Sequence, residues 1–472
     1  MKQLLLGLLC LLNGVYSFAQ IFDVEAIKVS GANENRINLV VLSEGYQVTE
    51  FEDFIADVTA FSDAMFNQSP FKEYTNYFNV YAIKVPSNES GADHPATATD
   101  VDESGSTPQL VDTYFNATFD AFGYHRYLYY GIDYAEAATA EAKIRSVLAD
   151  NFPTYDQALI LVNTPYYGGT GGEFPIAAAS ADANELALHE LGHSMFYLKD
   201  EYLLPDEYYS EGINMTQESN SNLVKWKNWM GINGIGTFQH GTTGVPASWY
   251  KPINAQCKME VLYKPFCSVC TEGIVERIHD LISPIESYSP VLNTVEGSGF
   301  PMDFQLNLIN TIPNTLETEW TLNETNFSNN LDGVSVEETD LVEGENTLIA
   351  AVHDASSFLK IDNHESLHIN TVTWTINYST LGVEGITSTE NSLSISMYPN
   401  PTSDIIHFKF ENNNGRSLKI DIIGVDGKVI KSLSVENYGQ QQLNLGDLKT
   451  GVYIARFYSD KILLATKKIV KN

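Results

Sequence analysis

The sequence has few cysteines, few basic residues and no long apolar run after its N-terminus. Four cysteines in 472 residues exclude a small disulfide-dense scaffold. Lysine and arginine number 27 against 60 aspartates and glutamates, which gives a formal net charge of -33. This charge argues against nucleic acid or an anionic membrane as a partner. The lack of a further apolar run of membrane-spanning length predicts no transmembrane segment.

Length and composition predict a large chain with several domains. A chain of 472 residues is long enough for about three domains. The apolar fraction of 43% and the aromatic fraction of 11% are sufficient for a sizeable core. The acidic surplus suits a protein of the extracellular medium. Because acidic side chains also bind calcium, Ca2+ is a candidate ion.

Residues 1–19 have the parts of a secretory signal peptide. Lys2 supplies the charged start, and residues 4–12 form an apolar run that is too short to span a bilayer. Ser17, Phe18 and Ala19 then precede a cleavage site before Gln20. The sequence therefore predicts export of the protein.

The exported chain would keep three cysteines, which are Cys257, Cys267 and Cys270. In an oxidising compartment we expect a disulfide between Cys257 and one of the other two. The alternative is a structural metal at Cys267-x-x-Cys270, for which the sequence offers no further cysteine pair.

The segment 182–202, DANELALHELGHSMFYLKDEY, has the pattern of a zinc-binding helix. On a helix, His189 and His193 lie one turn apart on the same face, so both imidazoles can reach one ion. Glu190 lies beside the first histidine, where it can act as the general base for a zinc-activated water. The spacing therefore predicts a metallopeptidase centre.

The residues around these histidines favour a helix. Asp182 can cap its N-terminus, and Glu185 is placed to reach back in a capping box. Leu186, Leu188, Leu191 and Met195 recur at helical spacing and can be buried. Because residues 194–198 contain no glycine or proline, the helix could continue for another turn.

A catalytic zinc ion needs a third protein ligand. The nearest carboxylates are Asp200 and Glu201, of which we favour Asp200. A metzincin has its third ligand six residues after the second histidine, beyond a glycine turn. Here Lys199 stands at the ligand position and Phe196 at the glycine position, so the turn must differ.

Three flanking features can contribute to the same site. The glycine-rich segment 166–180 can be an edge strand that pairs with an extended peptide, or a flexible loop. Met259 can lie in a turn beneath the metal or be an ordinary core residue. The candidates for stabilising the oxyanion are Tyr202, Tyr250 and Tyr263.

Hydrophobic periodicity predicts an α/β unit over residues 21–282. The expected strands span 37–42, 78–85 and 158–163, and the expected helices span 50–66 and 137–151. Residues 93–103 are polar and acidic and are expected to form a loop. The order of these elements predicts a sheet covered by helices.

Five segments together resemble the IgA-peptidase-type zinc metalloendopeptidases. They are the glycine-rich segment 166–180 and residues 189–202, 225–229 (KWKNW), 250–259 (YKPINAQCKM) and 266–270 (FCSVC). The resemblance implies a metzincin-like α/β (α+β) catalytic domain over 20–282, with a mixed sheet and an active-site helix. It also implies Zn2+ on His189, His193 and Asp200, Glu190 as the base, Met259 in a Met-turn, and a protein or peptide substrate.

The remaining chain predicts two small all-β sandwich modules. Residues 285–380 alternate as strands do, and residues 381–396 have the composition of a linker. Residues 397–472 contain MYPNP, DIIGVDGKVI and LKTGVYIARF, and resemble the C-terminal sorting domain of type IX secretion cargo in the Bacteroidetes. This resemblance implies that the type IX machinery is a partner and that the protein is secreted or held at the cell surface.

The main hypothesis is a secreted zinc-dependent endopeptidase. An alternative of a different class is a surface adhesion or glycan-binding protein with a degenerate peptidase domain. A third is a zinc hydrolase that acts on something other than protein, such as a peptidoglycan stem peptide. Since the motifs concern zinc chemistry, they leave the natural substrate open.

Overall fold

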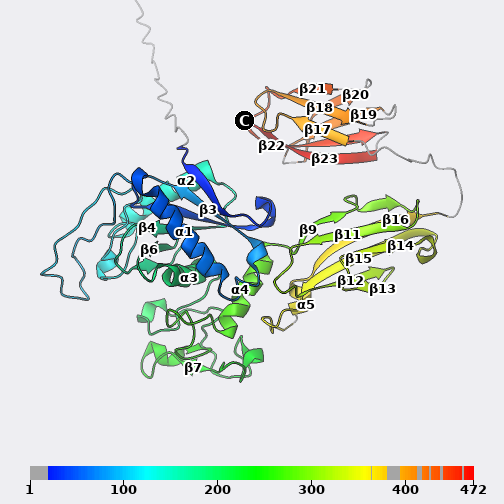
Figure 1. Ribbon diagram of the computed structural model, residues 1–472. Helices are drawn as coiled ribbons and strands as arrows, with labels where there is room; N and C mark the ends of the chain where they lie inside the picture. The colour runs from blue at the N-terminus through cyan, green and yellow to red at the C-terminus, as the bar shows by residue number, and fades with distance from the viewer. Residues whose placement is uncertain are drawn as a thin grey trace, which may run out of the picture. The chain divides into compact units, whose positions relative to one another are not determined.

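The computed structural model describes residues 20–362, 364–379, 394–411, 417–424, 427–435, 440–459 and 462–472. They belong to two compact units, Met1–Ser379 and Thr380–Asn472 (Figure 1). The expected signal peptide and most of the expected linker lie outside these described residues.

A six-stranded mixed sheet forms the centre of the N-terminal part of the first unit (Figure 1). Its strand order is β1-β3-β2-β4-β6-β5. The strands are β1 (Asp23–Lys28), β2 (Ile37–Glu44), β3 (Phe78–Lys84), β4 (Gln157–Val162), β5 (Gly169–Thr170) and β6 (Ile176–Ala178). The four inner strands are parallel, and β1 and β5 are antiparallel at the two edges. The three expected strands correspond to β2, β3 and β4, whereas the sequence did not predict β1.

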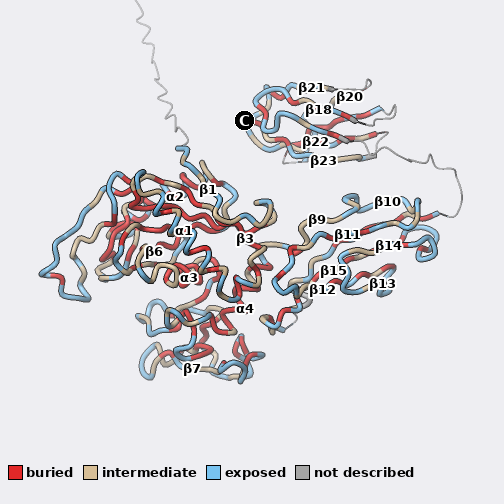
Figure 2. Tube along the Cα trace, in the orientation of Figure 1, coloured by how far each residue is buried: buried red, intermediate tan, exposed pale blue. Residues whose placement is uncertain are grey.

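Helices cover both faces of this sheet, so its central strands are buried on both sides (Figure 2). Leu39 and Val41 of β2 face a core shared with α1 (Phe51–Phe66), α3 (Ala183–Ser194) and α4 (Ser268–Leu281). Val40 and Leu42 face the opposite core, which includes α2 (Tyr134–Asn151). This alternation follows from the two-residue period of a strand. The expected helices correspond to α1 and α2.

The all-β region of the first unit consists of two facing sheets. Their strand orders are β10-β16-β15-β12-β13 and β14-β11-β9. The elements are β9 (Ile285–Ser289), β10 (Thr294–Glu296), β11 (Met302–Leu308), β12 (Leu316–Leu322), β13 (Thr325–Asn329), β14 (Gly333–Val336), β15 (Gly344–Asp354), α5 (His364–Leu367) and β16 (Asn370–Tyr378). Trp320 and Trp374 stack between the sheets, with ring centroids 5.8 Å apart.

Two smaller groups of strands complete the described structure. The second unit contains sheets of order β17-β18-β21 and β20-β19-β22-β23 around one core. Its strands are β17 (Ser394–Tyr398), β18 (Ile405–Glu411), β19 (Leu418–Ile423), β20 (Val429–Val435), β21 (Gln440–Asn444), β22 (Gly451–Ser459) and β23 (Ile462–Lys471). In the first unit, β7 (Phe238–Gln239) pairs with β8 (Tyr250–Lys251).

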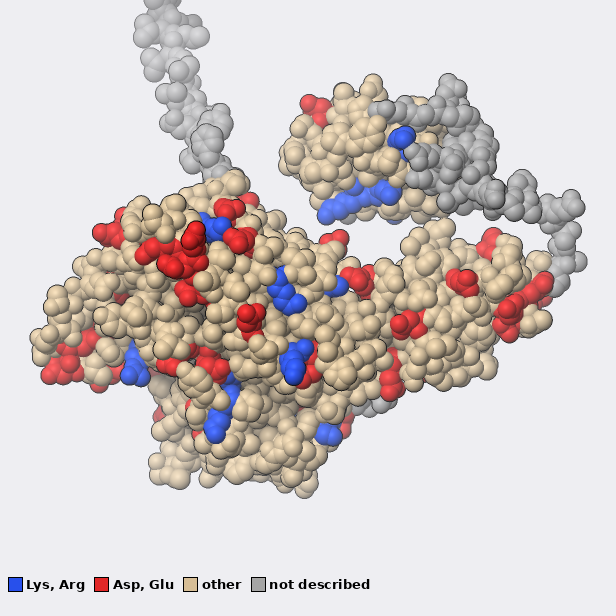
Figure 3. Space-filling view, viewed as in Figure 1, with Lys and Arg blue, Asp and Glu red and all other residues tan. Residues whose placement is uncertain are grey.

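The mixed α+β class with an all-β C-terminal region, which the sequence predicts, is confirmed at that level. On the face drawn in Figure 3, acidic side chains form several patches over the first unit, as the net charge requires. Among the described residues, no helix is long and apolar enough to cross a membrane.

Candidate active site

The three predicted metal ligands lie together in a cleft of about 730 Å³. His189 Nε2 is 3.2 Å from His193 Nε2. Asp200 Oδ1 is 3.0 Å from His189 Nε2 and 3.1 Å from His193 Nε2. Nitrogen and oxygen ligands on a tetrahedral zinc ion, each about 2.0–2.1 Å from the metal, are separated by about 3.3 Å. The donor atoms and their spacing therefore fit a zinc ion.

Backbone carbonyls orient both imidazoles for this arrangement. His189 Nδ1 lies 3.0 Å from the carbonyl oxygen of Lys258, and His193 Nδ1 lies 2.8 Å from that of Leu198. A carbonyl can only accept, so each Nδ1 donates and a neutral ring keeps its Nε2 lone pair. When both rings are neutral, two lone pairs and a carboxylate oxygen converge on one point. Such contacts on the far nitrogen are typical of metal-binding histidines.

The electric field at this point favours a cation. Burial lowers the pKa of His193, but the Asp200 carboxylate and Glu190 raise it to about 9. Burial acts to raise the pKa of Asp200, yet the two imidazoles hold it well below its usual value. The site therefore stabilises positive charge beside an ionised carboxylate.

The chain reaches Asp200 through a left-handed turn immediately after α3. The helix ends at Ser194, so the additional turn that the sequence allowed is not formed. Tyr197 has φ +58°, the Leu198 N–H donates to Gly192 O, and the Tyr197 N–H donates to His193 O. The bond from the Tyr197 N–H to His193 O, four residues back, is that of the αL motif, whose left-handed position is usually glycine. Tyr197 thus occupies a left-handed position without being glycine.

The capping box expected at the start of α3 is wrong. Asp182 occupies the N-cap position, but its side chain makes no capping hydrogen bond. Its carboxylate accepts from the Tyr263 hydroxyl instead. Glu185 pairs with Lys258 Nζ and also accepts from Gln68 Nε2 and the Tyr263 N–H. Contacts with Lys258 and Tyr263, which lie far along the chain, therefore replace the hydrogen bonds of a capping box.

Glu190 lies on α3 between the two histidines and lines the same cleft. Its side chain is buried, and burial raises the pKa of its carboxyl. An ideal Cβ added to Gly171 would lie 3.5 Å from Glu190 Oε2 and 3.1 Å from His193 Cβ. The glycine-rich segment therefore lies directly against α3.

That segment includes β5, which is one of the two edge strands of the six-stranded sheet. β5 pairs with β6 on one side only, and Gly169 lines the cleft. A Cβ at Gly169 would lie 3.0 Å from Leu186 of α3. The lack of side chains thus allows the edge strand to lie close to the helix at the border of the cleft.

Met259 lies beneath α3. It is fully buried, and an ideal Cβ at Gly192 would lie only 2.9 Å from Met259 Sδ. The Glu201 N–H donates to Met259 O at 2.8 Å. The turn that contains Lys258 and Met259 therefore contacts the helix, one imidazole and the chain next to Asp200.

The three candidate tyrosines lie in different surroundings. Tyr202 lines the cleft, and its ring is roughly parallel to that of His189 with centroids 6.3 Å apart. Burial and the nearby Asp200 and Glu190 carboxylates raise the pKa of Tyr202. Tyr250 lies on β8, and Tyr263 contacts Asp182; neither is among the residues that line the cleft.

Other residues that line the cleft were missed by the sequence reasoning. They include Tyr124, Arg126 and Tyr127 from a loop before α2, and Leu204, Pro205 and Tyr208 from the segment after Asp200. Burial, with smaller contributions from Tyr208 and Glu190, raises the pKa of Tyr127 to about 12. The aromatic run YHRYLYY (124–130) is conspicuous in the sequence, but it has no periodicity that would place it at a functional site.

The three cysteines are free thiols, so the expected disulfide is not formed in this structure. Cys257 Sγ is 3.6 Å from Cys270 Sγ, whereas a disulfide needs about 2.05 Å. Glu201, the alternative third ligand, points to these cysteines, with Oε1 3.3 Å from Cys270 Sγ. Asp200 and Glu201 thus lie in two different clusters.

Comparison with known families identifies two parts of the chain. Residues 25–235 match the family model described as IgA Peptidase M64. This part of the chain is therefore similar to the M64 peptidases. The match includes α3 and Asp200 and ends before Met259 and the three cysteines. Residues 396–472 match the Secretion system C-terminal sorting domain, which indicates type IX secretion to the cell surface or the extracellular space.

No curated protein matches the chain. Solved structures with partial similarity include dimeric latent PorU from Porphyromonas gingivalis, at 15% identity, 40% of this chain, 20% of that chain and a TM-score of 0.19. Another is the β-glucuronidase of Parabacteroides merdae, at 10% identity, 48% of this chain, 28% of that chain and a TM-score of 0.17. The fibronectin(III)-like modules of Clostridium thermocellum CbhA match at 12% identity. The match covers 39% of this chain and 93% of that chain, with a TM-score of 0.16. At these TM-scores the structural similarity supports no conclusion about fold or function. The chain spans less than a third of the length of PorU and of the β-glucuronidase.

Proposed function

We propose that this chain is a secreted, zinc-dependent endopeptidase with a metzincin-like catalytic domain. The observation that carries the proposal is the convergence of His189 Nε2, His193 Nε2 and Asp200 Oδ1 beside Glu190 in one cleft. The M64 match over the same residues and the sorting domain support it.

Zn2+ held by His189, His193 and Asp200 would supply Lewis acidity, which polarises a peptide carbonyl and lowers the pKa of a water molecule. The Glu190 carboxylate accepts a proton from that water and delivers it to the leaving amine nitrogen. Its position on α3, one residue after His189, holds it beside the metal ligands. Its low exposure removes competing solvent from the carboxylate.

The substrate would bind as an extended peptide along β5. An edge strand presents unpaired backbone groups, which can form a ladder with an added strand. Gly169 and Gly171 lie beside the cleft and beside α3, so a paired peptide would pass over the metal ligands. The tyrosines that line the cleft provide apolar faces for its side chains.

Two further residues take supporting roles in this proposal. Met259 forms the apolar floor under the helix and fixes the turn whose Lys258 carbonyl orients His189. Tyr202 lies beside both Asp200 and His189, where its hydroxyl can contact the ligand carboxylate or the substrate oxyanion.

Glu190→Gln tests the mechanism directly. This variant should lose at least about 10³-fold in kcat/KM on casein while its zinc content stays at that of the parent, because the amide cannot accept the proton. His193→Ala is the matched comparison and should lose both zinc and activity. A chelator should abolish the parent's activity, and added Zn2+ should restore it. Unchanged digestion of casein by Glu190→Gln contradicts the mechanism.

Metal analysis and substrate profiling decide among the alternatives. A purified chain without zinc would indicate an adhesion or glycan-binding protein in place of an enzyme. Chelator-sensitive cleavage of peptidoglycan stem peptides, with no cleavage of casein, would favour a zinc hydrolase that does not act on proteins over the proposed endopeptidase. For calcium there is no comparable support, since each metal-compatible cluster in the described chain includes nitrogen or sulfur atoms, and calcium prefers oxygen.

A further inference from the structure

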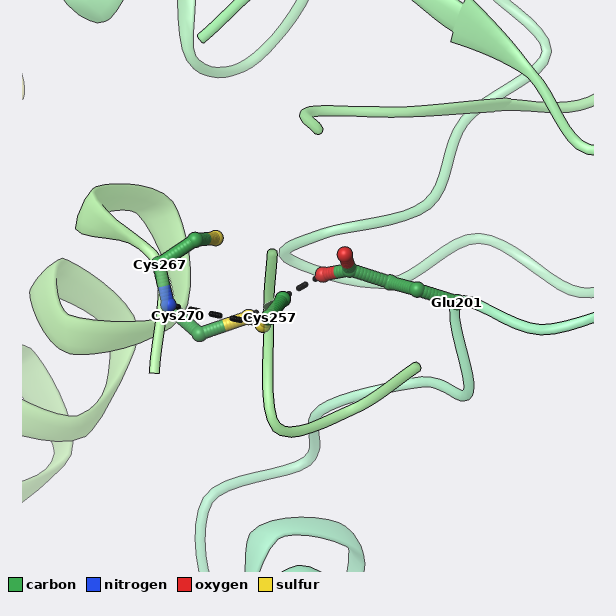
Figure 4. A group of neighbouring side chains, drawn as sticks. All are labelled: Glu201, Cys257, Cys267 and Cys270. Carbon is green, nitrogen blue, oxygen red and sulfur yellow. Dashed lines mark hydrogen bonds between the residues drawn. The ribbon is translucent and has the colours of Figure 1, made fainter. Parts of the chain in front are cut away.

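We propose that Glu201, Cys257, Cys267 and Cys270 bind a second, structural zinc ion. Figure 4 shows these four side chains, which come from three separate segments of the chain. Glu201 follows Asp200, Cys257 precedes the Met259 turn, and Cys267 and Cys270 lie at the start of α4. All four are buried, with exposed fractions of 0–6%.

The separations between donor atoms match a tetrahedral S3O site. With zinc–sulfur bonds of about 2.3 Å and a zinc–oxygen bond of about 2.0 Å, ligand atoms are about 3.8 Å apart for two sulfurs and about 3.5 Å apart for sulfur and oxygen. Cys257 Sγ and Cys270 Sγ are 3.6 Å apart, and Cys270 Sγ is 3.3 Å from Glu201 Oε1. All four donor atoms lie within 4.8 Å of one another.

An unpartnered carboxylate oxygen points independently to a cation. Glu201 has no exposed surface, and its Oε2 has no hydrogen-bond partner, while Oε1 accepts from Asn214 Nδ2 at 2.8 Å. A buried carboxylate is costly unless a positive charge lies beside it. The nearby lysines, Lys251 and Lys258, form ion pairs with Glu260 and Glu185.

The surroundings of the sulfurs also favour bound thiolates. The Cys267 N–H lies 3.4 Å from Cys257 Sγ, so a backbone donor faces that sulfur. Cys267 is the N-cap of α4 and Cys270 lies in its first turn, where the helix dipole stabilises negative charge. Among common divalent ions, three thiolates and one oxygen in tetrahedral geometry select zinc.

Such an ion would join α4 to both sides of the active site. Glu201 is adjacent to Asp200 and its N–H donates to Met259 O, and Cys257 is two residues before Met259. This role rests on the proposed function, whereas binding of the ion does not. Loss of the ion should therefore lower activity through the position of Asp200, while Glu190 stays in place.

Metal content of the purified, exported full chain tests the site. Cys267→Ser should lower zinc by one ion per chain and leave the ion of the His189 site, and Glu201→Gln provides a second variant that keeps all thiols. Glu207→Gln, an exposed carboxylate on the same segment, is the matched control and should leave zinc unchanged. Co2+ substitution should give thiolate charge-transfer absorption that Cys267→Ser weakens and His193→Ala does not.

Thiol alkylation under denaturing conditions, with a chelator and without a reductant, gives an independent result. Three alkylated cysteines per mature chain support the site. One alkylated cysteine shows a disulfide and overturns it, as does a zinc content that neither variant changes. Because His193→Ala reports only on the first site, failure of the proposed function is distinguishable from failure of this inference.

A different observation leads us to propose a third metal site, at His94, Glu103, Asp120 and His125. His94 Nε2 lies 3.2 Å from Glu103 Oε1 and 3.5 Å from Asp120 Oδ1. His125 Nδ1 lies 2.7 Å from Glu103 Oε1 and 3.7 Å from Asp120 Oδ1. All four donor atoms lie within 4.8 Å of one another, as two imidazoles and two carboxylates around zinc require.

The two carboxylates are oriented in the same way. Glu103 Oε2 accepts from the Ala98 N–H, and Asp120 Oδ2 accepts from the Thr97 N–H, so the other oxygen of each faces the histidines. Asp120 has no exposed surface, and its Oδ1 has no hydrogen-bond partner. Asp120 also has φ +60°, a conformation that the surrounding loop must stabilise. A cation at this point satisfies the orphaned oxygen.

This ion would hold the loop that supplies Tyr124, Arg126 and Tyr127 to the cleft. His94→Ala and His125→Ala should each lower zinc content by one ion per chain, with the thiolate absorption of the Co2+ protein unchanged. His353→Ala, a histidine on β15, is the control. Unchanged zinc in both variants overturns the site and shows an ordinary network of hydrogen bonds.

Discussion

Gly192 of α3 faces the Met259 side chain, and its replacement by alanine tests how Met259 supports α3, the helix of the proposed metal ligands. An ideal Cβ at position 192 lies 2.9 Å from Met259 Sδ and 3.3 Å from Met259 Cε. The first distance is shorter than packed carbon and sulfur atoms adopt, so the methionine must move. Its flexible thioether can shift, but the turn that carries it also orients His189.

Two opposing contributions set the magnitude. Alanine in place of glycine inside a helix stabilises by about 0.8–1.0 kcal/mol. Forcing extra volume into a packed core costs about 1–3 kcal/mol. Gly192→Ala should therefore destabilise the parent by up to about 2 kcal/mol. In a Met259→Ala background the clash is absent, so the same change should stabilise by about 0.8–1.0 kcal/mol.

A double-mutant cycle measures this change of sign. The four proteins are compared by the denaturant midpoint of the unfolding transition of the first unit, at one fixed concentration of free Zn2+, because metal binding itself contributes to stability. Activity on casein should fall for Gly192→Ala in the parent background. An identical effect of Gly192→Ala in both backgrounds would show that Met259 does not limit the space at position 192 and would refute the argument.

Two further predictions concern Tyr197 and Asp354. Arg277 lies 5.1 Å from the Tyr197 ring, and an Arg277→Ala background removes this contact. In that background, Tyr197→Gly should raise the free energy of unfolding by about 1 kcal/mol, because glycine relieves the strain of the left-handed backbone. A loss of stability in that background would contradict the left-handed turn. Burial acts to raise the pKa of Asp354, but hydrogen bonds from His279, Tyr74 and Thr315 lower it to about 2. The contribution of the Asp354 carboxylate to folding stability is therefore present above about pH 4 and is lost as the pH falls through 2. Asp354→Asn should therefore lower stability at pH 7 by about 2 kcal/mol and flatten the acid dependence between pH 4 and 2, as thermal unfolding at several pH values measures; parallel curves for parent and variant would exclude this role.

Local patterns in the sequence predicted the elements that form the site. The period of 3.6 residues indicated the helices that became α1 and α2, and continuous apolar runs indicated β2 and β4. The spacing of His189 and His193 required one helical face for both. These features depend on neighbouring residues, so the sequence alone is sufficient to find them.

Features that depend on distant partners were not predictable in this way. Asp182 and Glu185 had the pattern of a capping box, but Tyr263 and Lys258, more than 70 residues away, bind them instead. The left-handed conformation of Tyr197 has no glycine to indicate it, since the surrounding structure stabilises it. The loop of Tyr124 and Tyr127 has no periodicity that could place it at the cleft.

The sequence by itself determined the type of chemistry: two histidines one turn apart with a glutamate between them, in a chain addressed for secretion. Only the tertiary structure decided how the neighbouring carboxylates are used. After the turn at Tyr197, the side chains of Asp200 and Glu201 lie in two different clusters. Asp200 reaches the histidines of α3, and Glu201 reaches cysteines that lie 56–69 residues further along the chain. No local pattern specifies this division, because it depends on where α4 and the Met259 turn pack.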